Sequence, residues 1–543
     1  MTLQRRDLAV IPPDIAAVGQ QVLPPDNPYR VIGEQLADLV DDADFADLYD
    51  TRGRHAVSPA LLAMVTLFQF LEDIPDREAA AQVVVRLDWK YALHLPLTDT
   101  GFDQSCLCYF RKRLLAHQRE AQVFDTVLAK VRALGLLKKR GTQRTDSLAV
   151  LGAVRRLSAL ETVTETLRLA VRALADTAWG QREVPASFVA QYTDLRPDYR
   201  LSAAEQAALF LQVGRDGVWL LDRLAGAPTA VREQEPVATL RAVWDQRFEQ
   251  RDGGTQVRAQ TVDCTALIVT PHDPGVRAGQ KRGQAWRGEK VHVTETTEPE
   301  EAGGLTFITD VTTANASSGD GEALPQIRAR LAARALLPDE QVVDSGYISG
   351  PQLAQSQAAG VDLVGPPLAD TSPQAFKIAA FTIDREARQA RCPQGHRAVK
   401  WSERTERDGS RAVNIQFAAA TCAACPVRVQ CTSGTSGRSL HLSEHYERLM
   451  ARRAEAQTDA FRERMRARPA IEATLSELVR AHGLRRHRYR GEAKRAFENL
   501  LKGAACNLKR LVRALVARWE PAAAARALAV ARVAPVAPPP LAA

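Results

Sequence analysis

Short segments rich in β-branched residues alternate with helical segments between residues 256 and 370, and this alternation restricts the fold most strongly. The predicted elements are, in chain order, strands 256–271, 289–298 and 304–315, helix 321–337, strand 340–347, helix 351–360 and strand 361–367. Several strands followed by helix–strand alternation are typical of an α/β sheet that mixes antiparallel and parallel pairs. The sequence therefore predicts an α/β fold with a mixed sheet.

The segments around this sheet predict further domains. Residues 1–140 read as helical, with Ser58-Pro59 as a typical helix start. The predicted division is a helical domain 1–140, a core 141–370 with a helical insertion at about 150–255, a Cys-bearing insertion 371–440, core helices 441–517 and a disordered Ala/Pro tail 518–543. Both insertions are too long for simple loops, which predicts that they are folded modules.

Charge is concentrated near the C-terminal end. Residues 441–520 contain 19 Lys and Arg against 10 Asp and Glu, a local net charge of +9, whereas the whole chain carries +8. Such a surface favours a polyanion partner, above all nucleic acid, although a solvated Arg-rich helix pair has the same composition.

No apolar run approaches the roughly 20 residues that span a bilayer, and the start lacks a secretory h-region. A cytoplasmic location without membrane contact is expected.

Two aspartates lie within or at the end of strands of the predicted sheet. Asp146 belongs to the segment TQRTD, a candidate first strand, and Asp344 ends the strand EQVVD. Side chains from neighbouring strands can meet at one sheet surface, where two carboxylates would repel each other and raise one pKa. A divalent cation removes that conflict, and oxygen ligands favour Mg²⁺ or Mn²⁺. The alternative for Asp344 is a turn or cap residue.

A third carboxylate is expected from a helix packed on the sheet. Glu472 follows Pro469 at the edge of a predicted buried stripe, where it is either a ligand or a first-turn partner of the helix dipole. Glu477 and Glu492 are the rivals. Asp320 reads as a helix N-cap, although it could neighbour the site.

Five motifs in order resemble bacterial insertion-sequence transposases of the DDE type, in particular the eleven-eighty-two insertion-sequence family. They are SPALLAMVTLFQFLEDIPDREAAAQVVVRLDWKYALHL, QRTDSLAVLGAVRRL, PHDPGVRAGQKRGQAWRGEKVHVTET, VVDSGYISGPQL and GLRRHRYRGEAKRAFENLLKGAACNLKRL, and the resemblance covers most of residues 30–515. It implies an RNase H-like core built from 141–149, 256–370 and 441–517. It also implies a helical N-terminal domain that binds terminal inverted repeats or helps the chain to dimerise.

The resemblance assigns the catalytic acids. Asp146 and Asp344 match the two aspartates and Glu472 matches the glutamate. Of the related pattern Y-(2)-R-(3)-E-(6)-K, the Arg and the Glu are kept, as Arg468 and Glu472, whereas Met465 and Val479 stand at the Tyr and Lys positions. The implied reaction is phosphodiester hydrolysis and then strand transfer by two Mg²⁺ or Mn²⁺ ions, on double-stranded transposon ends and target DNA, with a homodimer on two ends. The alternatives are an RNase H-like nuclease that does not join strands and an inactive DNA-binding derivative.

Four cysteines cluster in the 371–440 insertion. Cys392, Cys422, Cys425 and Cys431 favour a structural Zn²⁺, with His396 as a possible substitute ligand, although only Cys422 and Cys425 form a CxxC pair. Reduced thiols under a loop are the alternative.

The run GLRRHRYRGEAKR predicts contact with the DNA backbone, because Arg forks hold phosphates and an aromatic ring can stack on a base. The predicted DNA contacts are Arg468, Arg485, Arg486, Arg488, Tyr489 and Arg490. The glycines of GQAWRGEK, residues 283–290, are spaced as in a phosphate loop but lack the Lys-Ser/Thr ending, so no nucleotide cofactor is expected.

Overall fold

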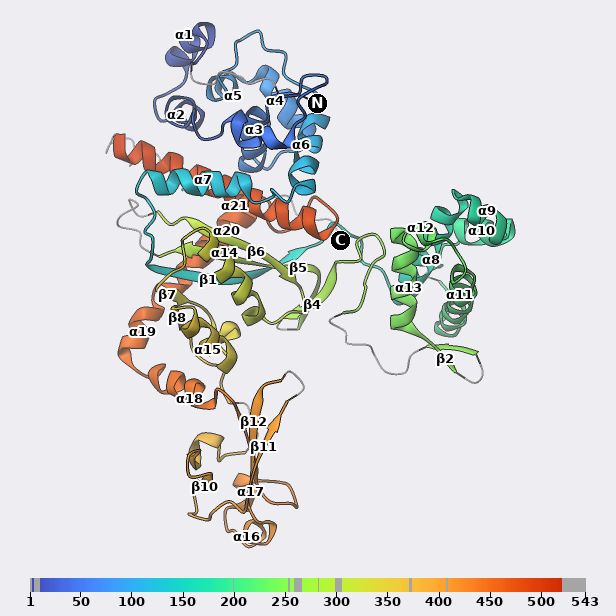
Figure 1. Cartoon of the computed structure of the whole chain (residues 1–543), viewed down its shortest axis with the longest axis vertical. Helices are drawn as coiled ribbons and strands as arrows, with labels where there is room; N and C mark the ends of the chain where they lie inside the picture. Colours follow the sequence, from blue (N-terminus) through green and yellow to red (C-terminus); the bar gives the residue numbers. More distant parts are fainter. Residues whose placement is uncertain are drawn as a thin grey trace.

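A computed structural model describes residues 2–3, 10–198, 200–251, 254–257, 266–281, 283–297, 305–370, 374–406 and 409–519. Figure 1 shows a central sheet with helices above it, a helical module to one side and a strand-rich module below. The predicted mixed α/β fold is confirmed. Among the helices of the described ranges, none is long and apolar enough to cross a lipid bilayer.

The N-terminal helices (residues 13–133) form a bundle above the sheet (Figure 1). The Ser58 hydroxyl accepts a hydrogen bond from the backbone N–H of Leu61, and Pro59 starts the most buried helix of the bundle. The elements are α1 (Pro13–Val22), α2 (Pro28–Gln35), η1 (Asp42–Leu48), α3 (Pro59–Leu71), α4 (Asp76–Val85), α5 (Leu87–Ala92), α6 (Ser105–Ala116) and α7 (Gln122–Ala133).

The central sheet has six strands in the order β4-β5-β1-β7-β8, with β6 paired to β5 as well. β1 pairs antiparallel with β5 and parallel with β7, so the sheet changes direction at β1. The strands are β1 (Thr142–Leu151), β4 (Arg277–Lys281), β5 (Gln284–Thr296), β6 (Ile308–Asn315), β7 (Glu340–Val342) and β8 (Asp362–Val364).

Helices from distant parts of the chain cover this sheet. The long α21 lies between the sheet and the N-terminal helices, where it packs on β6 from one side and on α3 and α7 from the other (Figure 1). The Asn507 side chain of α21 accepts from the Ile308 N–H and donates to its carbonyl, which fixes the helix on the edge of β6. The helices are η2 (Asp320–Ala323), α14 (Leu324–Ala333), η3 (Ser345–Tyr347), α15 (Gly350–Ala358), α18 (Tyr446–Glu455), α19 (Asp459–Met465), η5 (Arg468–Ala470), α20 (Ile471–Ala481) and α21 (Glu492–Trp519).

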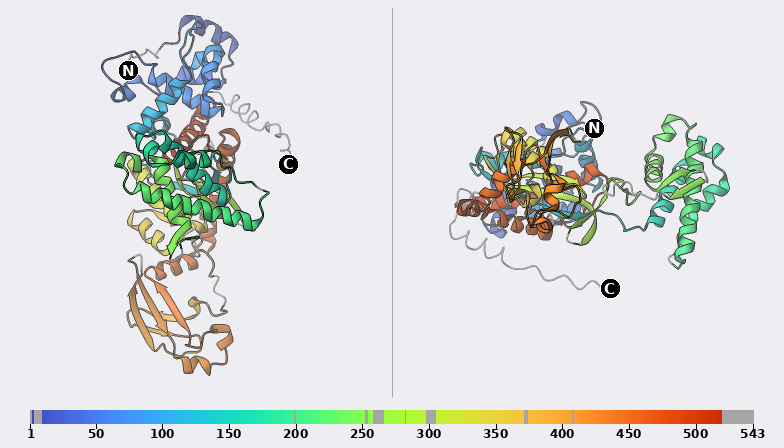
Figure 2. Two further views of the ribbon diagram at one scale, coloured as in Figure 1. Left: turned by 90° about the vertical axis from the view of Figure 1, so that its right-hand side faces the viewer. Right: turned by 90° about the horizontal axis from the view of Figure 1, so that it is seen from below.

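The helical module (residues 159–257) interrupts the core between β1 and β4, has its own hydrophobic core and stands apart from the sheet in Figure 2. Capping boxes at Ser158 with Glu161 and at Ser202 with Glu205 start its two longest helices. Its elements are α8 (Ala159–Ala175), α9 (Ala178–Glu183), α10 (Ala186–Asp194), α11 (Ala203–Leu224), α12 (Thr229–Arg232), α13 (Glu235–Arg247), β2 (Phe248–Arg251) and β3 (Gly254–Val257).

The Cys module (residues 374–443) is built on the antiparallel sheet β11-β12-β13, with Ile415 and Leu442 in its core. Its elements are η4 (Ile378–Ala380), β9 (Thr382–Asp384), β10 (Gln389–Arg391), β11 (Lys400–Thr405), β12 (Arg411–Gln416), α16 (Ala419–Ala423), α17 (Arg428–Cys431) and β13 (Ser439–Ser443).

The structure departs from the predicted elements at residues 256–271 and near the C-terminal end. The predicted strand 256–271 is wrong where it can be judged, because β3 ends at Val257 and residues 266–271 form turns and extended chain; residues 258–265 lie outside the described part. The Arg277–Thr296 hairpin of β4 and β5 supplies this part of the sheet instead. Of the predicted disordered tail, residues 520–543 lie outside the described residues, and α21 extends to Trp519.

Candidate active site

The strand register brings two of the predicted acids level with each other. Backbone pairing of β1 with β7 ends at Arg144 and Val342, which are partners in the parallel ladder. Asp146 and Asp344 each lie two residues beyond that last pair. The register therefore brings both residues to the same level at the end of this strand pair. Asp344 lies outside β7 and caps η3, where its carboxylate accepts from the Gly346 N–H at 2.9 Å.

Arg468 joins these two acids to Glu472. Its Nη2 lies 2.8 Å from an Asp146 oxygen and 3.7 Å from an Asp344 oxygen, and its Nη1 lies 3.5 Å from a Glu472 oxygen. The Asp146 side chain is 9% exposed, that of Asp344 27% and that of Glu472 69%. The structure thus gathers the three predicted acids around one guanidinium group, at a site that is open on the side of Glu472.

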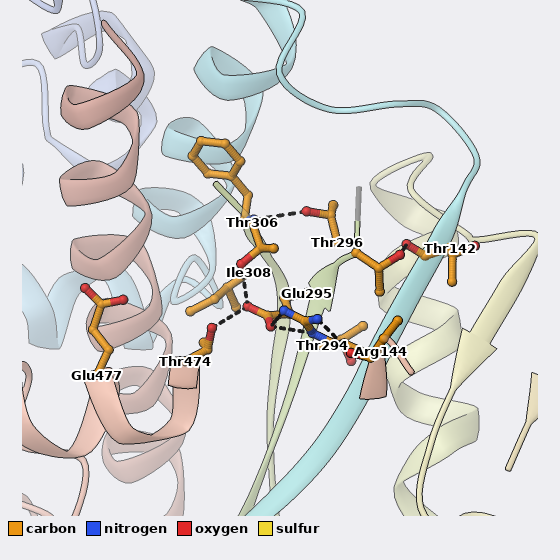
Figure 3. A network of polar contacts seen from close by, with 12 residues as sticks. Thr142, Arg144, Thr294, Glu295, Thr296, Thr306, Ile308, Thr474 and Glu477 are labelled. Atoms are coloured by element: carbon orange, nitrogen blue, oxygen red, sulfur yellow. Dashed lines mark hydrogen bonds and ion pairs between the residues drawn. The ribbon is translucent and has the colours of Figure 1, made fainter. Parts of the chain in front are cut away.

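A buried polar network fixes the helix that carries Glu472 and its preceding turn. Glu295 on β5 is fully buried and binds Arg144 of β1, while Thr474 of α20 donates to it at 2.5 Å (Figure 3). Arg510 of α21 completes the network by binding Glu295 at 3.2 Å and Thr474 at 2.7 Å. These contacts join four elements that are far apart in the sequence.

Arg144 extends this network to the turn before α20. Its Nη1 donates at 2.7 Å to the carbonyl of Ala467, the residue before Arg468. The network therefore holds the Arg468 turn and the start of α20 against β1. Sequence reasoning missed it, and the one available signal was a charged residue, Glu295, in the middle of a β-branched strand.

The two rival glutamates lie elsewhere. Glu477 forms ion pairs with Lys509 and Arg510, each at 2.9 Å. Burial alone would raise the pKa of Glu477, but the charges of Arg510 and Lys509 outweigh it and lower the pKa to about 2. Glu492 is exposed at the first position of α21.

Asp320 is also at the site, but not as a helix cap. It is the first residue of η2, and Gly319 occupies the cap position. Its Oδ1 accepts from the Ser147 hydroxyl at 3.1 Å and lies 3.0 Å from Lys290 Nζ. Asp320 therefore contacts the residue next to Asp146, and the N-cap prediction for it is wrong.

By the distances between ligand atoms, the group of side chains that could hold a metal is not the three predicted acids. In the part of the chain that the structure covers, Glu477, His482 and Cys506 are the single set of three or more Asp, Glu, His or Cys side chains whose ligand atoms all lie within 4.8 Å of one another. Burial raises the pKa of the Cys506 thiol to about 12, so the sulfur is protonated. Two cations already neutralise Glu477. Both facts disfavour a cation there.

The four predicted zinc ligands line one pocket of the Cys module. Cys392, Cys422, Cys425 and Cys431 are half-buried free thiols, and His396 lines the same pocket. Burial raises the pKa of the Cys431 thiol, Arg438 lowers it, and the three other thiols raise it further. They do not form a cluster as tight as that of Glu477, His482 and Cys506.

The predicted DNA contacts divide into two groups. Arg485, Arg486 and Arg490 are exposed, and the backbone of 485–487 pairs with Leu151 at the end of β1. Arg488 instead forms an ion pair with Asp73, and Tyr489 lies under the Arg111 guanidinium at 5.5 Å. The last two side chains thus face the N-terminal helices.

Two segments of the chain match models of transposase domains. Residues 18–113 match a model described as a transposase domain, DUF772, and residues 391–512 match the transposase DDE domain, a range that includes Arg468 and Glu472. Neither the curated proteins nor the solved structures contain a significant match to the chain. The two matches, one over the N-terminal helices and one ending in the long C-terminal helix, indicate that the chain is an insertion-sequence DDE transposase.

Proposed function

We propose that this transposase cuts DNA at transposon ends and joins them to a target, with Asp146, Asp344 and Glu472 as its catalytic acids. The observation that carries the proposal is their convergence on Arg468 from β1, the turn after β7 and α20. The sheet order, in which an antiparallel β4-β5-β1 half continues into a parallel β1-β7-β8 half, supports an RNase H-like core. The DDE match, residues 391–512, covers most of the Cys module and the core helices from α18 into α21, including Glu472.

The donor set fits Mg²⁺ or Mn²⁺. Four carboxylates (Asp146, Asp344, Glu472 and Asp320) lie around two cations (Arg468 and Lys290), so the site has a formal excess of two negative charges. Hard oxygen ligands with excess negative charge suit divalent cations of this kind. When bound, two such ions supply Lewis acidity and an activated oxygen nucleophile. Asp146, Asp344 and Glu472 would hold them.

The side chains of the site would position the ligands and bind the DNA phosphates. Asp146 is nearly buried on a rigid strand, so its carboxylate has a fixed place. Glu472 is exposed and follows a helix start, so the open side of the site is the side from which a DNA strand would approach. Arg468 offers a guanidinium that can hold a phosphate as well as a carboxylate. The exposed Arg485, Arg486 and Arg490 extend the positive surface along the end of β1.

The test uses the full chain, labelled donor ends and Mg²⁺, and it scores cleavage and joining separately. We expect Asp146→Asn, Asp344→Asn and Glu472→Gln each to lower both rates about 1,000-fold, or about 4 kcal/mol of activation free energy. Glu492→Gln is the matched control, because it changes an exposed glutamate at another helix start. Cleavage without joining by the wild type would favour the nuclease alternative. Loss of activity in the control but not in Glu472→Gln would contradict the glutamate assignment.

We also propose that the Cys module holds a structural Zn²⁺ through Cys392, Cys422, Cys425 and Cys431. Thiolates are the ligands of structural zinc sites, and Cys422 and Cys425 form the short pair that such sites use. Elemental analysis of the purified protein should give about one zinc per chain, and Cys422→Ser should lose it together with the cooperative unfolding of the module. Zinc content that is unchanged in Cys422→Ser would contradict the ligand set.

We also propose DNA ends and a second copy of the chain as the partners of this protein. The N-terminal helices would bind terminal inverted repeats or contribute to dimerisation, and two protomers would act on two ends. The match of residues 18–113 to a transposase domain supports a role of these helices in transposition. Light scattering with and without end DNA measures the number of chains in the complex.

A further inference from the structure

The acids Asp146 and Asp344 lie beyond the last backbone pair between their strands, so something other than the β-ladder must set the distance between them. The ladder of β1 and β7 ends at Arg144 and Val342. Arg468 contacts both carboxylates on one side. Arginine side chains have many rotamers, so a single guanidinium defines a separation poorly.

Asp320 contacts the residue after Asp146 and lies against the turn that follows Asp344. Its Oδ1 accepts from the hydroxyl of Ser147, the residue after Asp146, at 3.1 Å and lies 3.0 Å from Lys290 Nζ. Its Oδ2 lies 2.8 Å from the point that a Cβ atom would occupy at Gly346, and an Asp344 oxygen lies 3.1 Å from the same point. The Asp320 side chain is 13% exposed. It therefore touches β1, β5 and the turn that follows Asp344.

We propose that Asp320 is a positioning residue that sets the separation of the Asp146 and Asp344 carboxylates. This inference rests on the proposed function and deepens it, because it adds to the site a residue that neither the DDE match nor the three-acid assignment includes. Asp320 binds β1 through Ser147 and is packed against the Gly346 turn. Moving it would let the two acids change their distance.

Lys290 offsets the negative charge of Asp320 next to Asp344. Asp320 and Asp344 are both close to Gly346, and two carboxylates in a partly buried place repel each other. Lys290 compensates Asp320, and its own position is fixed by a second hydrogen bond, to the Ser318 carbonyl at 2.6 Å. A side chain at position 346 would displace one or both of these carboxylate oxygens.

The experiment is a Mn²⁺ titration of the full-length protein by electron paramagnetic resonance, with thermal unfolding as the check on folding. For Asp320→Ala we expect the same number of bound ions as in the wild type but an affinity 10- to 100-fold weaker, the usual effect of removing a residue that orients metal ligands. Asp320→Asn retains the shape and the bond from Ser147, so it should recover part of the affinity. Ser147→Ala is the milder second variant and should shift the affinity in the same direction.

Asp362→Ala is the matched control, because Asp362 is an ion-paired aspartate at the start of β8, next to β7 in the same sheet. Its Mn²⁺ titration should equal that of the wild type. Wild-type Mn²⁺ affinity in both Asp320→Ala and Ser147→Ala would overturn the positioning role of Asp320 and leave the proposed function intact. Loss of a bound ion in Asp320→Ala, as expected for Asp344→Ala, would also overturn it, because Asp320 would then be a ligand. A wild-type protein that binds no Mn²⁺ would overturn the proposed function itself.

Discussion

At the residue scale, two charged side chains organise the site: Arg468 contacts the three acids, and the buried Glu295 binds Thr474 of α20. Asp344 stands out because a strand pattern ends on a carboxylate, and Asp146 because it lies in the first strand. Arg468 was predicted as a DNA contact, yet here it binds three carboxylates. The partners of Glu295 could not be predicted, because they come from β1, α20 and α21, up to 215 positions away in the sequence.

Glu477 offers a test of how the C-terminal helices are held together. Glu477→Gln should lower the free energy of unfolding by about 3 kcal/mol, because it leaves Arg510 and Lys509 without their counter-charge in a largely buried place. Urea unfolding at pH 7 measures this change. Glu463→Gln is the control, since its ion pair with Arg466 is exposed and contributes little.

The ion pairs of Glu477 also predict how the free energy of unfolding depends on pH. The pKa of Glu477 falls from its ordinary 4.5 to about 2 on folding, so the stabilisation is complete above pH 4.5 and is lost as the pH falls from 4.5 to 2. The wild type and Glu477→Gln should therefore differ most near neutral pH and converge in acid. A difference that is independent of pH would contradict the ion-pair explanation.

At the scale of elements, the periodicity of apolar residues predicted strands and helices correctly where one face of the element is buried. The segments 304–315 and 340–347 contain β6 and β7. Helix α14 lies within the predicted helix 321–337, and α15 begins one residue before the predicted helix 351–360. The prediction failed at 256–271, which has many β-branched residues although the described part beyond β3 does not pair in the sheet. The strands β4 and β5 were underestimated because Gly279, Gly283 and Gly288 resemble turn signals.

Thr474 tests whether the buried network positions α20. Thr474→Val conserves the shape but removes the hydroxyl that donates to Glu295 and accepts from Arg510. We expect a loss of about 1–3 kcal/mol in unfolding free energy, because the buried charged partners lose a hydrogen bond. DNA cleavage should fall more than stability alone explains, because the start of α20 carries Glu472. The two effects are measured by urea unfolding and by single-turnover cleavage under conditions where the variant is fully folded.

The control for this experiment is Thr164→Val in the helical module. Thr164 is buried and its hydroxyl has no hydrogen-bond partner among the described residues. The same chemical change there should be neutral or stabilising. Equal effects of the two substitutions on cleavage would show that the network does not position the site.

At the scale of the whole molecule, contacts that no local pattern reveals join the N-terminal helices to the core. His482 bonds to the Phe70 carbonyl at 3.0 Å, and Arg488 pairs with Asp73 and lies over the Phe70 ring. The basic segment therefore has two sides, one docked on the N-terminal helices and one exposed. Composition predicted its charge, but only the fold shows which arginines remain available to DNA.

The exposed side of the basic segment leads to a prediction about the salt dependence of DNA binding. Each arginine that neutralises a phosphate adds about 0.9 to the slope of log affinity against log salt concentration. The variant Arg485→Ala/Arg486→Ala/Arg490→Ala should lower that slope by about 2 to 3 and weaken binding similarly on all sequences. Fluorescence anisotropy at several salt concentrations measures the slope. The control Arg462→Ala/Arg466→Ala removes two exposed arginines, one in α19 and one that follows it, and should leave the slope unchanged. An equal change in both variants would mean that the whole basic surface, rather than the segment beside β1, follows the DNA.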